Sequence, residues 1–172
     1  RLGRQGDALG CFERAIADAP EFADAHGNRA SALMELGRFE EAAAGYERAV
    51  ALEPNSVGDW LNLGTVLHRL GRHGDAVASY DRVLASHANI PEAHFNRGNV
   101  LAHLARYDEA LASYDRALAI NRRYAEALNA RGRVLLELGR IEGAIANVEE
   151  ALALAPDRLG PLGQMVDTLI LR

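Results

Sequence analysis

The sequence contains no lysine, because all 19 basic residues in the chain of 172 are arginines. Schiff-base catalysis and the lysine of a phosphate-binding loop are therefore excluded. Cys11 is the only cysteine, so the chain can form neither an intrachain disulfide nor a zinc site made of several cysteines. No apolar run approaches the roughly 18 residues of a membrane-spanning helix, and the sequence predicts no membrane span.

Aromatic residues and positive charge are also scarce. The formal net charge is -5, whereas a nucleic-acid surface normally shows a clustered basic excess, so we expect no nucleic acid as a partner. Hydrophobic residues make up 49 % of the chain but aromatic residues only 6 %, which reflects its high content of alanine and leucine. These strong helix formers favour short, closely packed helices and give no indication of strands.

Motifs that carry chemistry are absent from the sequence. The serines occur in no nucleophile motif, there is no glycine-rich phosphate loop, and the carboxylates are spread along the chain. His68 and His103 could approach each other, but no carboxylate or cysteine pattern accompanies them. We therefore expect no catalytic residue, no metal site and no cofactor, and we interpret the protein as a non-enzyme.

What the sequence does contain is an internal repeat of 34 residues. In residues 91–120, apolar side chains recur at helical spacing in two runs separated by Arg106, which predicts two short amphipathic helices joined by a tight turn. Two positions of this unit recur along the chain: Ala8, Ala42, Ala76, Ala110 and Ala144, and Phe12, Tyr46, Tyr80, Tyr114 and Val148. A fixed period in this range with helix–turn–helix content indicates a solenoid.

The turns within the repeats carry glycine where a left-handed helix end is needed: Gly3, Gly37, Gly71 and Gly139, with Ala105 as the exception. The first of these predicts a turn at Gly3 and Arg4. Acidic residues follow the turns, where negative charge complements the dipole of the next helix: Asp7, Glu40, Glu41, Asp75, Asp108, Glu109 and Glu142. We interpret these carboxylates as structural.

Trp60, Leu63 and Gly64, followed by Ala76 and Tyr80, carry the resemblance to a known family. Together with the 34-residue period, this pattern resembles the tetratricopeptide repeat. The resemblance implies an all-α fold, a right-handed α-solenoid of antiparallel helix pairs that forms a single domain over residues 1–172. It also implies a half repeat at 1–22, full repeats at 23–56, 57–90, 91–124 and 125–158, and a terminal helix at 159–172.

Three other repeated positions have expected structural roles. The residues that hold the position of Trp60 in the other repeats are expected to pack in the same way: His26, His94 and Leu128. Close approach of the paired helices is expected at the small residues Ala30, Gly64, Gly98 and Gly132, so bulky substitutions there should be costly. Packed stems, with charged ends reaching solvent or a neighbouring acid, are expected for Arg29, Arg97 and Arg131.

The chain begins within a repeat and without methionine, so we expect it to be a fragment of a longer, cytoplasmic protein. The terminal helix carries Val166, Leu169, Ile170 and Leu171, which is too apolar for an exposed end. We expect this helix to be an apolar seam that continues into further protein or forms a dimer surface. Self-association end to end through the terminal half repeats is another hypothesis.

The resemblance places the first helices of the repeats along a concave groove. One asparagine per repeat would line this groove, together with further side chains from the same helices: Asn28, Asn62 and Asn96, with Asn99, Thr65, Phe95 and Arg133. An amide both donates and accepts, so a spaced ladder of amides could bind the backbone of an extended peptide. The alternative interpretation is that asparagine tolerates a wet helix surface, and Ala130 breaks the ladder in the fourth full repeat.

A clamp for a terminal carboxylate, another use of this fold, is not expected. The positions that would supply its outer cations hold Gly27, Leu61, Phe95 and Asn129, or Asp24, Gly58, Glu92 and Glu126. Arg133 is the only cation that we expect to face the groove, and one arginine does not make a clamp.

The leading hypothesis is therefore a protein–protein interaction scaffold that binds a peptide or protein partner in its groove, as the similarity to bacterial tetratricopeptide repeat proteins implies. The alternative is the substrate-recruiting arm of a larger enzyme such as a glycosyltransferase. That alternative follows from a resemblance of the asparagine ladder to the repeat region of O-linked N-acetylglucosamine transferases.

Overall fold

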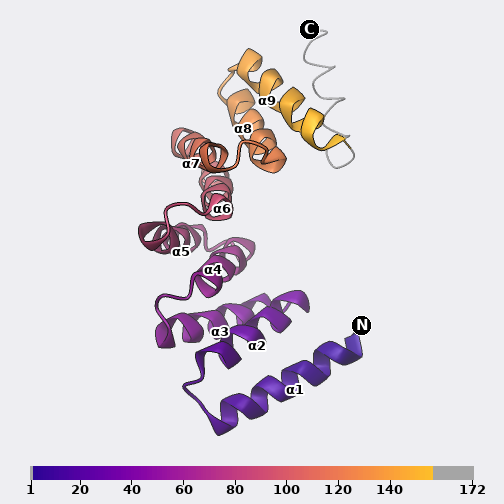
Figure 1. Ribbon diagram of the computed structural model, residues 1–172, viewed down its shortest axis with the longest axis vertical. Helices are drawn as coiled ribbons and strands as arrows, with labels where there is room; N and C mark the ends of the chain where they lie inside the picture. The colour runs from indigo at the N-terminus through magenta and orange to yellow at the C-terminus, as the bar shows by residue number, and fades with distance from the viewer. Residues whose placement is uncertain (1, 157–172) are drawn as a thin grey trace. The chain divides into compact units, whose positions relative to one another are not determined.

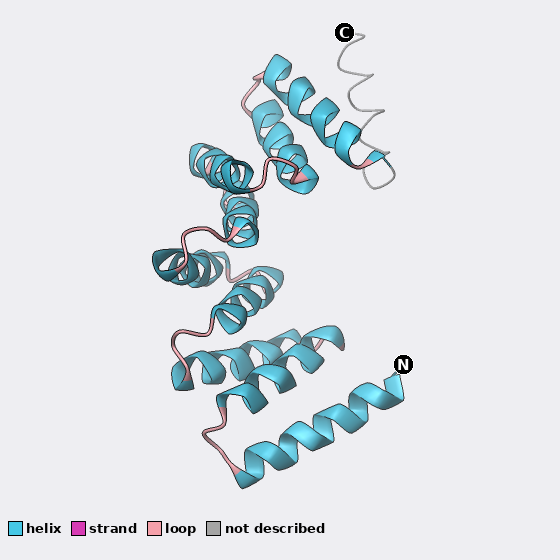
Figure 2. Cartoon of the chain, viewed as in Figure 1, coloured by secondary structure: helices cyan, strands magenta, loops and turns pink. Residues whose placement is uncertain are grey.

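The structure is a computed structural model that describes residues 2–156. Over this range the chain forms α-helices joined by short turns and contains no strand (Figure 1, Figure 2). The helices are α1 (Leu2–Asp18), α2 (Ala23–Glu35), α3 (Phe39–Leu52), α4 (Val57–Arg69), α5 (His73–Ser86), α6 (Pro91–His103), α7 (Tyr107–Ile120), α8 (Ala125–Glu137) and α9 (Ile141–Leu154). The prediction of an all-α chain is confirmed.

The chain divides into two compact units, unit 1 (Arg1–Ser86) and unit 2 (His87–Arg172). In unit 1, α2 packs against α3 and α4 packs against α5; in unit 2, α6 packs against α7 and α8 against α9 (Figure 1). Successive first helices of the repeats also touch within each unit, α2 with α4 and α6 with α8. The fold is thus a helical-repeat solenoid, as expected, in which the helix pairs pack on one another within each unit.

The core of both units is built from the positions that recur in the sequence. The repeated alanines and tyrosines are buried: Ala42, Ala76, Ala110, Ala144, Tyr46, Tyr80 and Tyr114. The rings of Tyr80 and Tyr114 each lie against a glycine of the first helix. A Cβ atom on Gly64 would lie 2.7 Å from the Tyr80 ring, and one on Gly98 would lie 2.6 Å from the Tyr114 ring. No side chain fits there, because real Cβ contacts are longer than this, and the expected close approach of the paired helices is confirmed.

The first full repeat meets the same packing requirement with two facing positions exchanged. It has Ala30 on α2 and Gly45 on α3, where a Cβ atom on Gly45 would lie 2.9 Å from the Cβ of Ala30. The next two repeats carry the glycine on the first helix and a side chain on the second: Gly64 with Ser79, and Gly98 with Ser113. In each of the three repeats, one of the two facing positions lacks a side chain.

The turn inside each repeat is a Schellman motif. The amide of Arg38 donates to the carbonyl of Leu33 at 2.9 Å, and the amide of Gly37 donates to that of Met34 at 3.0 Å. The residue at this helix end is left-handed in every full repeat, with φ of 75°, 75° and 70° at Gly37, Gly71 and Gly139. Ala105 adopts the same conformation with φ of 55°, which strains a residue that has a Cβ atom.

The expected turn at Gly3 and Arg4 is wrong, because α1 runs as one helix from Leu2 to Asp18. Asp7 therefore lies inside α1 and not in the first turn of a helix, which corrects its expected role. The terminal helix expected at 159–172 lies outside the described residues.

The position of Trp60 provides a hydrogen bond as well as packing. The indole Nε1 of Trp60 donates to the carbonyl of Pro54 at 2.9 Å. The imidazole Nε2 atoms of His26 and His94 donate in the same way to the carbonyls of Pro20 and Ala88, each at 2.9 Å. Histidine replaces tryptophan here because both rings offer an N–H that ties the helix to the residue six positions earlier.

Three of the acidic residues that follow the turns, Glu41, Asp75 and Glu109, pair with an arginine three residues earlier, which agrees with their structural interpretation. Arg38 pairs with Glu41 at 2.6 Å and Arg106 with Glu109 at 2.7 Å, each across the start of a second helix. The hydrogen bonds from these arginines lower the pKa of both glutamates. Such exposed pairs contribute little to stability, so their main effect is to orient the turn.

Candidate functional site

The first helices of unit 1 present one candidate surface, which we call the α2/α4 face. It comprises Asp24, Gly27, Asn28 and Ser31 of α2 and Gly58, Leu61, Asn62 and Thr65 of α4, because side chains three and four residues apart share one side of a helix. Asn28 is exposed, whereas Asn62 is half-buried. The two amides therefore differ in how freely a ligand could reach them.

Asn62 has a partner inside unit 1. Burial raises the pKa of Tyr46, and hydrogen bonds from Ser31 and, more weakly, from Asn62 oppose that rise. The hydroxyls of Ser31 and Tyr46 lie 2.8 Å apart. Tyr46 of α3 is thus tied to Ser31 of α2, and the amide of Asn62 on α4 lies near the Tyr46 hydroxyl.

Thr65 is also engaged in packing. Its Oγ1 lies 3.1 Å from the Tyr80 hydroxyl and donates to the carbonyl of Leu61 at 3.0 Å. Next to it, the carboxylate of Asp59 occupies the space above Gly27, where a Cβ atom would lie 2.5 Å from Asp59 Oδ1. Ser56 at the start of α4 donates to the same carboxylate at 2.6 Å. On the α2/α4 face, the Asp59 side chain therefore occupies the space beside Gly27 that a ligand would otherwise enter.

The first helices of unit 2 present the second candidate surface, which we call the α6/α8 face. It comprises the equivalent residues, Glu92, Phe95, Asn96 and Asn99 of α6 and Glu126, Asn129, Ala130 and Arg133 of α8, with Tyr124 at the start of α8. Asn99 accepts a hydrogen bond from the Tyr114 hydroxyl at 2.9 Å. Burial raises the pKa of Tyr114, and the positive charge of nearby Arg133 opposes the rise.

An aromatic cluster lies at one end of the α6/α8 face. The ring of Phe95 is 5.0 Å from that of Tyr124 and 6.2 Å from that of Tyr114, measured between centroids. Phe95 and Tyr124 are half-buried. Burial raises the pKa of Tyr124 to about 12, and the negative charges of Glu92 and Glu126 add to that rise. Two carboxylates therefore act on the exposed part of the aromatic pair.

Two amides of the α6/α8 face have hydrogen-bonding capacity that the described part of unit 2 does not use. Asn96 is half-buried and forms no side-chain hydrogen bond with the described residues of its own unit. The Oδ1 atom of Asn129 is buried, and no donor among the described residues reaches it. An unsatisfied buried acceptor is costly, so this oxygen is a place where a ligand could donate a hydrogen bond.

The predicted site residues thus fall into two groups, one in each unit. Unit 1 holds Asn28, Asn62 and Thr65, and unit 2 holds Phe95, Asn96, Asn99 and Arg133. The sequence-based choice missed Tyr124 and did not include Asn129, Glu92 or Glu126. Tyr124 follows a turn at a position where the other repeats have Phe22, Ser56 and Ile90, and this variation gave no signal of its own.

Two of the arginines at the position of Leu63 reach a neighbouring acid, as expected. Arg29 pairs with Glu13 at 3.5 Å, and Arg131 pairs with Asp115 at 2.6 Å. Arg97 donates to the Ser113 hydroxyl at 2.8 Å. Arg133 is exposed instead, and it is therefore the cation of the α6/α8 face that a ligand can reach.

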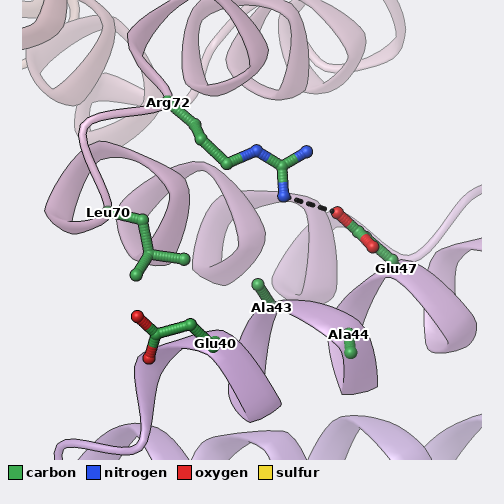
Figure 3. Close-up of a pocket in the computed structure, with 6 residues that line it drawn as sticks. All are labelled: Glu40, Ala43, Ala44, Glu47, Leu70 and Arg72. Carbon is green, nitrogen blue, oxygen red and sulfur yellow. Dashed lines mark hydrogen bonds and ion pairs between the residues drawn. The ribbon is translucent and has the colours of Figure 1, made fainter.

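Unit 1 also has a shallow pocket of about 290 Å³ between α3 and the turn that joins α4 to α5. Figure 3 shows the guanidinium of Arg72 reaching the carboxylate of Glu47 across this pocket, at 3.1 Å. Arg72 also pairs with Asp75 at 2.8 Å. Because these charges neutralise one another within the fold, we interpret the pocket as a contact between neighbouring repeats.

His68 has a histidine neighbour within unit 1. His68 contacts His73, with 3.1 Å between the two Nδ1 atoms, a pair that the sequence did not suggest. No group of three or more metal-ligating side chains occurs among the described residues. Two imidazoles leave most of a metal coordination shell unfilled, so the pair carries no metal assignment.

A family model for the tetratricopeptide repeat matches residues 1–57, 61–124 and 106–158. The fold is similar to the crystal structure of MamA, with a TM-score of 0.86 at 17 % identity over 91 % of this chain and 92 % of that one. It is also similar to YrrB, described as a TPR protein with an unusual peptide-binding site, with a TM-score of 0.82 at 22 % identity over 95 % and 85 %.

A third similar structure is TTC0263, a thermophilic TPR protein in Thermus thermophilus, with a TM-score of 0.74 at 28 % identity over 99 % of this chain and 93 % of that one. No curated protein matches the sequence. None of these three structures is described as a glycosyltransferase, so the hypothesis of a recruiting arm gains no support. Within residues 2–156, no helix is both long and apolar enough to cross a membrane.

Proposed function

The chain belongs to the tetratricopeptide repeat family, and on that premise we propose that it is a non-catalytic scaffold that binds a peptide segment of a partner protein on the α6/α8 face. The repeat fold supports protein–protein interaction in general. The description of YrrB as having a peptide-binding site supports a peptide as the class of ligand.

The observation that carries this proposal is the half-buried aromatic pair of Phe95 and Tyr124 beside unused amide groups. Aromatic side chains in partly buried positions often contribute most of the binding free energy of an interface. Asn96 and Asn129 lie on the same face and can donate to or accept from a peptide backbone. An apolar anchor with flanking hydrogen-bonding groups is the combination that an extended peptide needs.

A more specific part of the proposal concerns the asparagine ladder of Asn28, Asn62 and Asn96, whose amides were predicted to bind a peptide backbone. Asn28 and Asn96 are available for a ligand backbone, whereas Asn62 shares its amide with Tyr46. On the α6/α8 face the ladder therefore contributes through Asn96, and Asn62 is mainly structural in unit 1. Each amide contributes one or two neutral hydrogen bonds, so the aromatic pair dominates affinity.

The test is selection of binders from an unbiased peptide display library with the whole chain as bait, followed by calorimetric titration of the recovered peptides. Replacing Phe95 with alanine should weaken binding by about tenfold or more, because a hot-spot side chain contributes upwards of about 1.4 kcal/mol. Leu61→Ala is the matched control, since Leu61 holds the same repeat position in unit 1, and it should leave the affinity unchanged.

Circular dichroism melting of each variant separates binding from folding. Failure to recover any peptide, or equal affinities of wild type and Phe95→Ala with an unchanged melting curve, would contradict the proposal.

A further inference from the structure

We propose that the α6/α8 face recognises a basic side chain, arginine or lysine, of the bound peptide, and holds its charged end beside Phe95, Tyr124, Glu92 and Glu126. This inference rests on the proposed function and names the chemistry of the partner. It follows from four features of unit 2 that all favour a cation that donates hydrogen bonds.

The first feature is the aromatic pair. The rings of Phe95 and Tyr124 lie 5.0 Å apart and are tilted by 45°, and both are partly exposed. The face of an aromatic ring attracts a cation, and the attraction grows when the cation is partly shielded from water. The alkyl stem of arginine or lysine can pack on the same rings, so one side chain satisfies both the apolar and the electrostatic character of the site.

The second feature is the pair of carboxylates. Glu92 is three residues before Phe95 on α6, and Glu126 is three residues before Asn129 on α8, so each acid shares a helix side with the residue that it precedes. Both negative charges act on the hydroxyl of Tyr124. Because α6 and α8 touch, the two acids and the phenol lie at one end of the α6/α8 face.

The third feature is the unsatisfied oxygen of Asn129. Its Oδ1 atom is buried, and no donor among the described residues reaches it. A guanidinium has five N–H donors and an ammonium has three, and neither accepts a hydrogen bond. A basic side chain that pairs with Glu126 can therefore also donate to Asn129, which relieves the cost of a buried acceptor.

The fourth feature is the position of the only exposed cation among the described residues of this face. Arg133 lies seven residues after Glu126 on α8, about 10 Å along the helix axis. A carboxylate of the ligand would be repelled at the aromatic end and attracted near Arg133. The face therefore orients a peptide with its basic residue beside Tyr124.

The equivalent surface of unit 1 lacks this combination. The position of Phe95 is Gly27 in α2 and Leu61 in α4, and the carboxylate of Asp59 beside Gly27 already accepts a hydrogen bond from Ser56 at 2.6 Å. The inference thus assigns selectivity for a basic residue to unit 2.

The experiment uses the whole chain and the peptides recovered from the unbiased library. The test variant carries Glu92→Gln and Glu126→Gln, which removes two charges and keeps side-chain size. The matched control carries Asp24→Asn and Glu53→Gln, which changes the net charge equally at exposed positions of unit 1. A second test variant, Phe95→Leu, keeps an apolar side chain and removes the ring.

We expect the recovered peptides to share an arginine or lysine, and its replacement by glutamine to weaken binding by about tenfold or more, because hydrogen bonds to charged groups are the stronger ones. The Glu92→Gln and Glu126→Gln variant should lose affinity to a similar extent and should bind with less dependence on salt. The control variant should bind like wild type, and Phe95→Leu should be weaker than wild type with an unchanged melting temperature.

The outcomes separate this inference from the proposed function. Peptides that bind and lose affinity with Phe95→Ala, but share no basic residue or tolerate Glu92→Gln and Glu126→Gln, overturn the inference and leave the proposed function standing. Recovery of no peptide overturns both.

Discussion

The two units of the chain carry different side chains at equivalent positions of the same repeat. Their cores match, since buried alanines and tyrosines recur in α3, α5 and α7. Their first-helix faces differ most at the first, second and fourth of the positions compared, whereas the third is asparagine in three of the four helices. Unit 2 alone has glutamate, phenylalanine and arginine among these positions: Asp24, Gly27, Asn28 and Ser31 with Gly58, Leu61, Asn62 and Thr65 in unit 1, against Glu92, Phe95, Asn96 and Asn99 with Glu126, Asn129, Ala130 and Arg133 in unit 2.

This difference shows which positions the fold constrains. A position that faces the paired helix is fixed by volume, as Gly64 and Gly98 are by the tyrosine rings that they contact. A position on the first-helix face has fewer neighbours within its unit and can vary with the ligand. Unit 1 uses its face to connect its own helices through Tyr46, whereas unit 2 leaves an acceptor and two rings available.

The largest expected effect concerns the cores of the two units, where in each unit a glycine of the first helix faces a tyrosine ring. Gly98→Val places a branched side chain where a single Cβ atom would already lie 2.6 Å from the Tyr114 ring. Overpacking of this kind should lower the free energy of unfolding by about 2 to 3 kcal/mol, and Gly64→Val should do the same in unit 1.

Urea and thermal denaturation followed by circular dichroism measure this change. Gly58→Val is the control, because a Cβ atom there meets nothing within 4 Å, and it should change stability by less than about 0.5 kcal/mol. A wild-type melting curve for Gly98→Val would refute the common packing rule.

The next prediction compares Asn62 of unit 1 with Asn96 of unit 2, which we expect to affect stability and binding differently. Asn62→Ala removes a contact to Tyr46 and should lower the free energy of unfolding by about 1 kcal/mol. Asn96→Ala should leave stability unchanged and weaken peptide binding by about two- to tenfold, the equivalent of one hydrogen bond. Melting curves and titrations of both variants provide the comparison. Equal losses of stability would mean that both residues serve the fold.

The smallest effect concerns the turns of the two units. Ala105 is left-handed with φ of 55°, whereas Gly71 holds the equivalent position in unit 1 with φ of 75°. Ala105→Gly should stabilise the protein by about 0.5 to 1 kcal/mol, because relief of the strain exceeds the entropy lost by glycine. Gly71→Ala should destabilise it by a similar amount. Denaturant titration measures both, and a destabilising Ala105→Gly would show that the strain is relieved by other contacts.

Much of the fold was predictable because each structural requirement appears in the sequence several times, once in each repeat. The tyrosine column, the glycine turns and the small residues that face the rings recur at 34 residues, and each recurrence reflects a local requirement for volume or backbone conformation. The exception at Gly3 shows the limit of this method. The glycine fits the column, but α1 runs through it as one helix, and column matching alone does not distinguish a glycine within a helix from a glycine at a turn.

The candidate site was less predictable because it depends on residues that break the repeat. Phe95 and Tyr124 are neighbours only through the packing of α8 against α6, and neither has an aromatic equivalent in every repeat. The contact between Asn62 and Tyr46 was hidden for the opposite reason. In the sequence, a recurring asparagine is equally consistent with ligand binding and with packing. Only the structure, which places the Tyr46 hydroxyl near Asn62, distinguishes the two roles.

The glycine of the facing pair has changed helix between two repeats, and this has an evolutionary consequence. The first full repeat has Ala30 with Gly45, and the second has Gly64 with Ser79. If the repeats arose by duplication, a lineage cannot move from one arrangement to the other by a single substitution. In the first full repeat, a side chain at both facing positions would place the two Cβ atoms 2.9 Å apart, as a Cβ on Gly45 would meet that of Ala30. Glycine at both positions avoids this collision at a cost in packing and helix propensity. From the arrangement of Ala30 with Gly45, the route without a collision therefore passes through a loosened helix pair, and the two positions should covary across related sequences.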